Sequence, residues 1–272
     1  MSTTAPAWKA TSQARLAWND LKDGLKAHRV WVRLARMDIK QRYRRSILGP
    51  FWITLTMIIW IVALGPLYSH LLGVGSRGFI PYLAMGIITW GLISGVILDG
   101  AAAFVTAENL VRSVKLPYTV HILRVLHRNL VIFAHNLVAF VPFMIYLGIR
   151  PEWTWLAAIP GVALILLAAL PTAFLLGTLS ARYRDLQQMI ASVVQLAFFI
   201  TPIFWQREQL KGRTYIADYN PFQILLEVVR RPIVEGIPPM ATYGKCFILI
   251  ALLYLVTAPF FARYRRRLAF WV

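Results

Sequence analysis

The sequence is poor in acidic residues and holds a single cysteine. Its 11 Asp and Glu stand against 29 Lys and Arg, which gives a formal net charge of +18. Cys246 has no second cysteine with which to form an intrachain disulfide. A proton-coupled carrier normally places several acids inside its membrane segments. Here only Asp99 lies near the end of an apolar run, where snorkelling to the interface would account for it, so a secondary carrier is disfavoured.

The common motifs for catalysis, metal binding and nucleotide binding are also missing. The only Gly-Lys pair, at 244–245, is followed by cysteine and lacks the preceding glycine of a phosphate-binding loop. No two of the five histidines have the i, i+4 spacing of a helical zinc site, and no Gly-x-Ser-x-Gly elbow occurs. We therefore expect a chain that is not an enzyme, with no catalytic residue, metal or cofactor of its own.

Long apolar runs without charged residues dominate what the sequence does contain. Hydrophobic residues make up 58% of it, and the mean hydropathy is +0.60. A run of about 18 such residues can cross the hydrocarbon layer, about 30 Å thick, as a helix. Six runs reach or approach this length, which predicts an all-α polytopic membrane protein with six transmembrane helices. The runs are residues 51–72, 79–98 and 130–149, parts of 153–181 and of 186–206, and residues 246–262, the shortest.

The distribution of positive charge predicts the orientation, because Lys and Arg accumulate on the cytoplasmic side of membrane proteins. Of the 29 Lys and Arg, 21 lie in the segments that six crossings place on one side, and six of the other eight lie in the 205–245 loop. We therefore expect both termini in the cytoplasm. Because the charges flank the apolar runs, they favour lipid head groups over nucleic acid as partners. The expected regions are a cytoplasmic N-terminal region (1–50), a six-helix transmembrane domain (51–262) and a cytoplasmic tail (263–272).

The N-terminal region contains a basic amphipathic segment. We expect residues 1–26 to be a poorly ordered N-terminal segment with some helical character. In residues 28–46, basic side chains recur at steps of three and four and form one stripe on a helix. Such a helix tends to lie in the membrane interface, although a simple topology anchor is an open alternative. Arg42, Arg44 and Arg45 could hold a phosphate by charge-assisted hydrogen bonds or rest against ordinary phospholipid.

Two loops on the expected cytoplasmic side carry local signals. Thr106 and Asn109 precede an apolar pair, and Pro117 follows, which predicts a short helix. That helix could be a docking peg for a partner or a plain connector. Arg182 and Asp185 are three residues apart and could form an ion pair on one helix face.

The opposite side has one large loop, residues 205–245. The Asn-Pro pair at 220–221 predicts a helix start, and Arg-Arg-Pro at 230–232 predicts its end. One or two short gate helices, re-entrant or capping an opening, should therefore lie between the fifth and sixth spans. Trp60 and Trp90 fall within spans, where lipid-facing packing and a sugar-stacking surface along a conduit are both open.

Three stretches together resemble the membrane subunit of type-two ABC exporters for lipid-linked polysaccharides, the family of O-antigen, capsule and teichoic acid permeases. They read Arg-Tyr-Arg-Arg-Ser-Ile-Leu-Gly-Pro-Phe-Trp at 42–52, Glu-Asn-Leu-Val-Arg-Ser-Val-Lys-Leu-Pro at 108–117 and Ala-Arg-Tyr-Arg-Asp-Leu at 181–186. Asn-Pro-Phe at 220–222 fits as well, and the resemblance extends over nearly the whole chain.

The resemblance implies a homodimer in the bacterial inner membrane, with a conduit lined by the first and fifth spans. Two copies of a separate ABC ATPase, which carries ATP and Mg, would dock from the cytoplasm, and residues 220–236 would form the gate. The ATPase-coupling residues would be Glu108, Asn109, Leu110, Val111, Arg112, Lys115, Arg182 and Asp185. The residues near the lipid diphosphate would be Arg42, Arg44 and Arg45. The conduit or gate residues would be Trp60, Tyr68, Phe198, Phe199, Phe204, Trp205, Asn220, Phe222 and Arg230.

The expected function is export of an undecaprenyl-diphosphate-linked polysaccharide, with the basic stretch at 42–45 favouring O-antigen. A type-two exporter of drugs or small lipids is the first alternative. A membrane-embedded glycosyltransferase is the second, but it would need paired acids at the membrane surface. Asp99 and Glu108 are nine residues apart, and the sequence shows no obvious partner for either.

Overall fold

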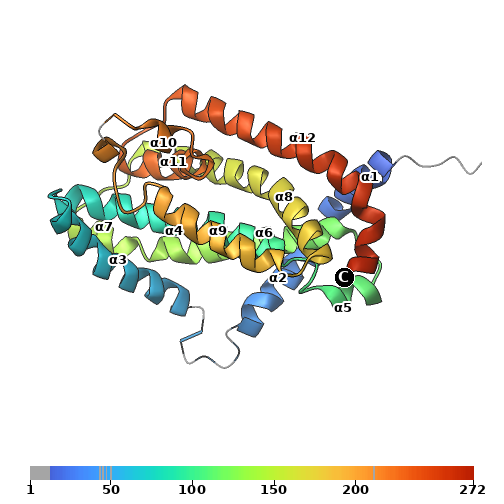
Figure 1. The fold of residues 1–272 in the computed structure, drawn as a ribbon. Coiled ribbons are helices and arrows are strands. Elements are labelled where there is room, and N and C mark those ends of the chain that lie inside the picture. Colours follow the sequence, from blue (N-terminus) through green and yellow to red (C-terminus); the bar gives the residue numbers. More distant parts are fainter. Residues whose placement is uncertain (1–12, 43, 45, 47, 50, 211) are drawn as a thin grey trace, which may run out of the picture.

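The computed structural model describes residues 13–42, 44, 46, 48, 49, 51–210 and 212–272 (Figure 1). Every regular element in these residues is a helix, which confirms the predicted all-α class. Arg45 lies outside the described residues, as do residues 1–12. The long helices are α3 (Phe51–Leu71), α4 (Ser76–Ala101), α6 (Tyr118–Val138) with α7 (Val141–Leu147), α8 (Ala158–Arg182) preceded by the 3-10 helix η1 (Trp153–Ala157), and α12 (Met240–Trp271).

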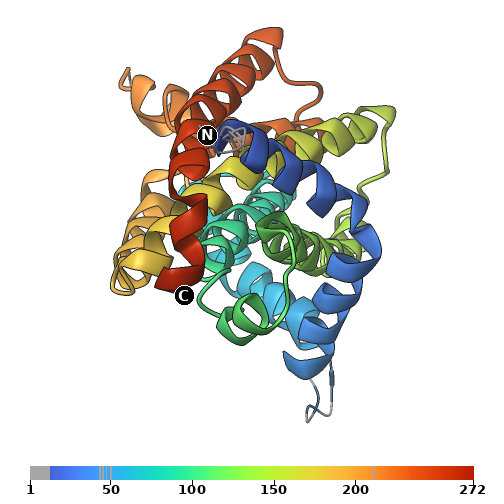
Figure 2. The same cartoon turned by 90° about the vertical axis from the view of Figure 1, so that its right-hand side faces the viewer.

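Shorter helices lie at the two ends of this bundle. Figure 1 shows α1, α5 and the C-terminal part of α12 together at one end of the bundle, which we call the α5 end. Helices α7, α10 and α11 lie at the opposite end, which we call the α11 end. Figure 2 looks onto the α5 end, where α1 and α2 cross the bundle. The shorter helices are α1 (Gln13–Lys26), α2 (His28–Arg42), α5 (Glu108–Ser113), α9 (Leu186–Ile200), the 3-10 helix η2 (Arg207–Leu210), α10 (Tyr215–Asp218) and α11 (Pro221–Val234).

Helix α4 is the centre of the bundle. Of its most apolar 18-residue stretch 78% is buried, against 17% for α3. It comes very close to α8 at Gly100: a Cβ there would lie 2.7 Å from the Cβ of Ala173, and one on Gly177 would lie 2.8 Å from the Gly100 carbonyl oxygen. Small residues that let backbones approach are typical of helix packing in membranes, and they fix α4 against α8 here.

Five helical segments are long and apolar enough to cross a membrane. The predicted fifth crossing corresponds to α9, which has 15 residues and a length of about 22 Å at 1.5 Å per residue, less than the hydrocarbon layer. The chain after α9 bends at residues 201–205. The structure therefore supports five crossings, and the sixth stays a prediction.

Three helices extend beyond the expected segments. Helix α6 begins at Tyr118 rather than near residue 130, because Arg124 and Arg128, which interrupt the apolar run, are held in ion pairs. Helix α12 continues through the expected tail to Trp271. Part of the N-terminal segment predicted to be poorly ordered is the regular helix α1, which packs on α6 and α12.

Candidate docking surface and gate

The predicted short helix before Pro117 is present as α5, at one end of the bundle (Figure 2). Asn109 is exposed and Leu110 partly exposed, whereas Val111 packs against the core. Glu108 pairs with Arg112 at 3.0 Å and with Arg184 at 3.5 Å. This exposed helix is therefore tied by charge to the segment that follows α8.

Two other segments complete the surface around α5. Arg112 donates to the carbonyl oxygen of Val272, with an Nε–O distance of 3.0 Å. The guanidinium of Arg182 lies 5.3 Å from the ring centroid of Trp271. We call residues 108–113, 182–185 and 271–272 the docking surface. Lys115, another predicted coupling residue, is exposed just beyond it.

The expected ion pair between Arg182 and Asp185 does not form. Helix α8 ends at Arg182, so the two residues do not share a helix face, and Asp185 stands at the start of α9. Arg182 stacks instead on Tyr183, 5.0 Å from the ring centroid, and on Trp271.

A buried carboxylate that sequence reasoning missed anchors the α5 end. Asp20 accepts from the backbone N–H groups of Tyr118 and Thr119 at 3.0 and 2.9 Å, and from the Thr119 hydroxyl at 2.8 Å. It also pairs with Arg265 of α12 at 3.0 Å, and its side chain has 0% exposure. Helix α1 thus supplies the N-terminal cap of α6, whose own cap residue is Pro117 and cannot do so. The sequence did contain a signal for this external cap: a proline stands at the cap position, where Ser, Thr, Asp or Asn would otherwise cap the helix.

A second charge network joins α2, α6 and α4. Asp38 binds Arg124, with an Nε–Oδ2 distance of 2.7 Å, and Arg128 at 2.9 Å. Arg128 also pairs with Asp99 at 2.9 Å, and Asn129 donates to the same carboxylate at 2.8 Å. Asp99 therefore has partners within the bundle, Arg128 and Asn129, which the snorkelling interpretation did not include.

The basic stripe of α2 faces away from this network. Arg29, Arg33, Arg36 and Lys40 are exposed, which confirms the predicted one-sided stripe. The two described arginines of the proposed phosphate cluster, Arg42 and Arg44, are exposed as well.

Four of the predicted conduit or gate residues meet in one aromatic cluster towards the α11 end. Tyr68 stacks on Phe204 at 5.3 Å, and Phe204 contacts Phe198 at 4.8 Å, measured between ring centroids. Trp90 lies 5.5 Å from both Phe198 and Phe222. Trp90 is 7% exposed, so it does not face lipid; it links α4 to the segments that precede and follow the 201–205 bend.

The other aromatic candidates are not buried in this cluster, although the Phe199 ring contacts the Phe198 ring at 5.5 Å between centroids. Trp60 and Phe199 are 48% and 61% exposed, and Trp205 donates its indole N–H to the Phe199 carbonyl oxygen at 3.2 Å. Sequence spacing could not separate these outward rings from the buried ones.

Asn220 caps α11 as predicted. Its Oδ1 accepts from the backbone N–H groups of Phe222 and Gln223 at 2.9 and 3.3 Å, and its Nδ2 donates to the Thr201 hydroxyl at 3.1 Å. The predicted end of the helix at Pro232 is wrong: α11 continues to Val234.

Arg230 holds the 201–205 bend. It is 3% exposed, donates to the Pro202 carbonyl oxygen at 2.6 Å, and lies 3.9 Å from the ring centroid of Tyr82. The Tyr82 hydroxyl also reaches the Pro202 carbonyl oxygen, at 3.1 Å. We call Tyr82, Pro202 and Arg230 the gate latch, since it connects α4 and α11 to the chain after α9.

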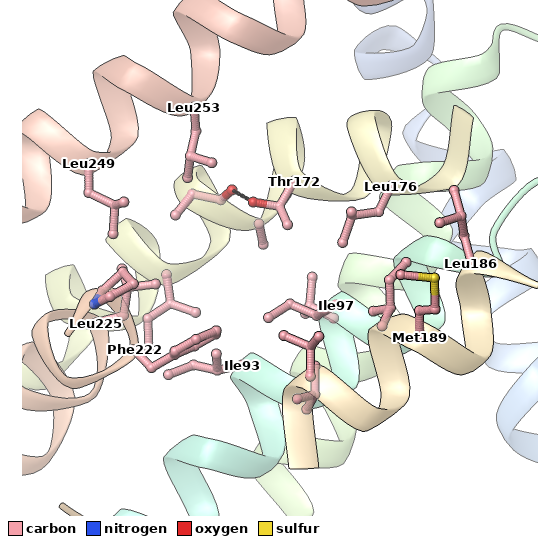
Figure 3. Close-up of a pocket in the computed structure, with 18 residues that line it drawn as sticks. Ile93, Ile97, Thr172, Leu176, Leu186, Met189, Phe222, Leu225, Leu249 and Leu253 are labelled. Atoms are coloured by element: carbon pink, nitrogen blue, oxygen red, sulfur yellow. Dashed lines mark hydrogen bonds between the residues drawn. The ribbon is translucent and has the colours of Figure 1, made fainter. Parts of the chain in front are cut away.

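An apolar cavity of about 400 Å³ lies between α4, α8, α9, α11 and α12 (Figure 3). Ile93, Phe222, Leu249 and Met189 are among its lining side chains. The hydroxyl of Thr172 is satisfied by the Ala168 carbonyl oxygen at 2.8 Å. Phe222 borders both this cavity and the aromatic cluster, so the cavity offers a hydrocarbon-like space next to the gate.

Comparison with known proteins identifies the family of the chain. The family model described as "ABC-2 type transporter" matches residues 29–233, which include α5, the gate latch and nearly all of α11. The chain belongs to the ABC-2 type transporter family. This ABC-2 permease is thus a multi-pass membrane protein and a transport subunit, and its family implies an ABC ATPase partner.

Curated relatives of this ABC-2 permease have a common name. It is 20% identical over 240 residues to the O-antigen export system permease protein RfbA of Klebsiella pneumoniae, covering 88% of this chain and 93% of the relative. It is 27% identical over 206 residues to the O-antigen export system permease protein RfbA of Myxococcus xanthus, covering 72% and 76%.

Proposed function

We propose that this permease exports an undecaprenyl-diphosphate-linked polysaccharide, with O-antigen as the favoured glycan, from the cytoplasm to the periplasm across a bacterial inner membrane. The observation that carries the proposal is the placement of the docking surface and the gate latch at opposite ends of one bundle (Figure 1). The O-antigen export relatives, which align over most of the chain, support the choice of substrate.

In this proposal the α5 end faces the cytoplasm, where two copies of an ABC ATPase dock and hydrolyse ATP with Mg. The sequence lacks a phosphate-binding loop, which fits hydrolysis on a separate chain. The exposed arginines Arg42 and Arg44, with Arg45, would receive the lipid diphosphate, because guanidinium groups bind phosphate by paired charge-assisted hydrogen bonds.

A second copy of the chain would complete the conduit. Helices α3 and α9 leave large apolar side chains exposed, Trp60 and Phe199 among them. In a protomer these side chains would face lipid or a second protomer, and the proposal assigns them to the face between protomers.

The decisive test of the substrate is where finished glycan accumulates. Cells that lack this chain should retain completed lipid-linked polysaccharide on the cytoplasmic side, and complementation should restore it to the surface. The measurement is the amount of intracellular and surface glycan by gel and immunoblot. Normal surface glycan in the deletion strain would remove the proposal.

The docking of the ATPase is tested by Leu110→Asp, because Leu110 is partly exposed on α5 whereas Val111 packs inward. Co-purification of the ATPase should fall at least tenfold. Ile237→Asp is the matched control, since Ile237 is an exposed apolar residue near the α11 end (65% exposed). Equal loss in both variants, or in neither, would contradict docking at α5.

The apolar cavity favours a second candidate, export of a drug or small lipid, because its lining suits a hydrocarbon ligand. The glycan assay separates the two candidates. A glycosyltransferase is disfavoured further, since Asp99 and Glu108 are both engaged in ion pairs.

A further inference from the structure

A small polar pocket of about 180 Å³ lies at the α11 end, and it shares no lining residue with the aromatic cluster or the apolar cavity. Residues of η2, α10, α11 and the first turns of α12 surround it. Its polar and charged lining residues are Arg207, Asp218, Gln223, Glu227, Arg231, Thr242 and Lys245.

The positive groups of this pocket already have partners within the chain. Arg207 pairs with Asp218 at 2.7 Å, and Lys245 donates to the backbone carbonyl oxygen of Asp218 at 3.1 Å. Arg231 pairs with Glu235 at 3.3 Å. With its cations committed in this way, the pocket is poorly suited to a phosphate or another anion.

The acceptors of the pocket, by contrast, are not all used. Gln223 is 4% exposed, and its Nε2 donates to Glu227 at 2.8 Å, which fixes the orientation of the amide. Its Oε1 is buried and meets no donor in the described part of the chain. Leaving such an acceptor unpaired is unfavourable, so the pocket favours a ligand that brings hydrogen-bond donors.

We propose that this pocket is a carbohydrate subsite that holds one neutral sugar unit through its hydroxyl groups. A sugar hydroxyl donates to Gln223 Oε1, and a second donates to the free oxygen of Glu227. A neutral polyol supplies several donors without adding charge to the balanced cations and acids. This inference rests on the proposed function and adds to it a place where the glycan is held at the outer end of the conduit.

The direct test is saturation-transfer NMR on the full permease–ATPase complex in phosphatidylglycerol nanodiscs. The probes are D-glucose, D-galactose, D-mannose and L-rhamnose, with inorganic phosphate and ethanolamine as comparators. At least one neutral sugar should give a signal. That signal should fall at least fivefold in Gln223→Met, which removes both amide groups with little change of shape, and in Glu227→Ala, a partly exposed position. Glu208→Ala should retain it, because Glu208 is an exposed acid on η2 outside the pocket lining.

Several results would overturn the subsite: no signal from any sugar, a sugar signal in both pocket variants as strong as in wild type, or a signal from phosphate or ethanolamine alone. The failures of the two proposals are distinct. If sugars do not bind but the deletion strain still accumulates lipid-linked glycan, the subsite falls and the export function stands. If sugars bind and the deletion strain keeps normal surface glycan, the export function falls.

Discussion

At the scale of single residues, Asp20 has the most concentrated set of interactions at the α5 end. Asp20→Ala removes the cap of α6, a loss of about 0.5–2 kcal/mol. It also leaves Arg265 without its buried partner, and breaking a buried pair costs about 3–5 kcal/mol. We expect a clear fall in the midpoint of thermal unfolding, measured on the purified permease in detergent.

Two variants separate the contributions of Asp20. Asp20→Asn should fall between wild type and Asp20→Ala, because an Asn side chain caps a helix but does not neutralise Arg265. Asp23→Ala is the control, since Asp23 is exposed on the same helix, and it should unfold like wild type. An Asp20→Ala protein as stable as the Asp23→Ala protein would contradict the anchoring role.

A second prediction at this scale concerns Arg230 of the gate latch. Arg230→Ala removes the donor to the Pro202 carbonyl oxygen and the group stacked on Tyr82, so the 201–205 bend should open more often. Hydrogen exchange of the backbone amides of residues 203–205 should become at least tenfold faster. Arg230→Lys should recover little, because an ammonium cannot reproduce a planar stack.

The neighbouring arginine provides the control for that measurement. Arg231 points to Glu235 instead of the bend, so Arg231→Ala should leave exchange at residues 203–205 unchanged. Equal acceleration in the Arg230 and Arg231 variants would mean that α11 as a whole has loosened, which would contradict a specific latch.

The sequence could predict some of these residues and not others, for a physical reason. The Asn220 cap was predictable because its partners are two and three residues away. The Asp20 cap was not, since its partners lie 98 and 99 residues along the chain. Arg230 was singled out by resemblance, but its contact with Pro202 depends on a bend that no local pattern specifies.

At the scale of helices, α9 determines whether the chain crosses the membrane six times. We expect α9 and the 201–205 segment to cross together, because the apolar run at 186–206 is longer than the helix alone. Single cysteines replacing Arg184 and Gln209 should react with a membrane-impermeant thiol reagent from opposite sides of the membrane, one in inverted vesicles and the other in right-side-out vesicles. The chain's own Cys246 is buried.

The controls for this topology experiment are cysteines at Asn109 and Ser113 of α5, which should label from the same side as the cysteine at Arg184. Labelling of the Arg184 and Gln209 positions from one side would make α9 a re-entrant helix. The chain would then have five crossings, and its termini would lie on opposite sides of the membrane.

The helix boundaries show where apolar runs in the sequence are enough to predict the position of a helix. The runs located α3, α4 and α8 well because their ends coincide with charged or turn residues. The start of α6 was missed because Arg124 and Arg128 read as loop residues in sequence, whereas Asp38 and Asp99, from two other helices, hold them inside the bundle. Charge pairing between distant segments is invisible to a hydropathy pattern.

At the scale of the whole molecule, α12 extends from the α11 end to the α5 end (Figure 1). Its first turns, which include Lys245, line the polar pocket. Its last residue, Trp271, belongs to the docking surface. It is one helix of 32 residues with Pro259 inside it, and its path, about 48 Å at 1.5 Å per residue, bends towards the C-terminal end (Figure 1). Arg265 ties that end to Asp20 of α1 and to the Tyr118 ring of α6. If an ATPase docks at α5 as proposed, α12 is the element that connects that surface to the α11 end.

The arrangement of two protomers is the last prediction. If α3 and α9 line a conduit between two copies, cysteines replacing Trp60 or Phe199 should cross-link into a species of twice 31.0 kDa with a long-arm reagent. Phe247→Cys is the matched control: Phe247 is a similarly exposed residue, 56% exposed, but on α12, and it should remain monomeric. Because each reactive group must meet its own copy across a two-fold axis, cross-linking at Phe247 without cross-linking at Trp60 or Phe199 would move the interface to α12 and remove α3 and α9 from the conduit.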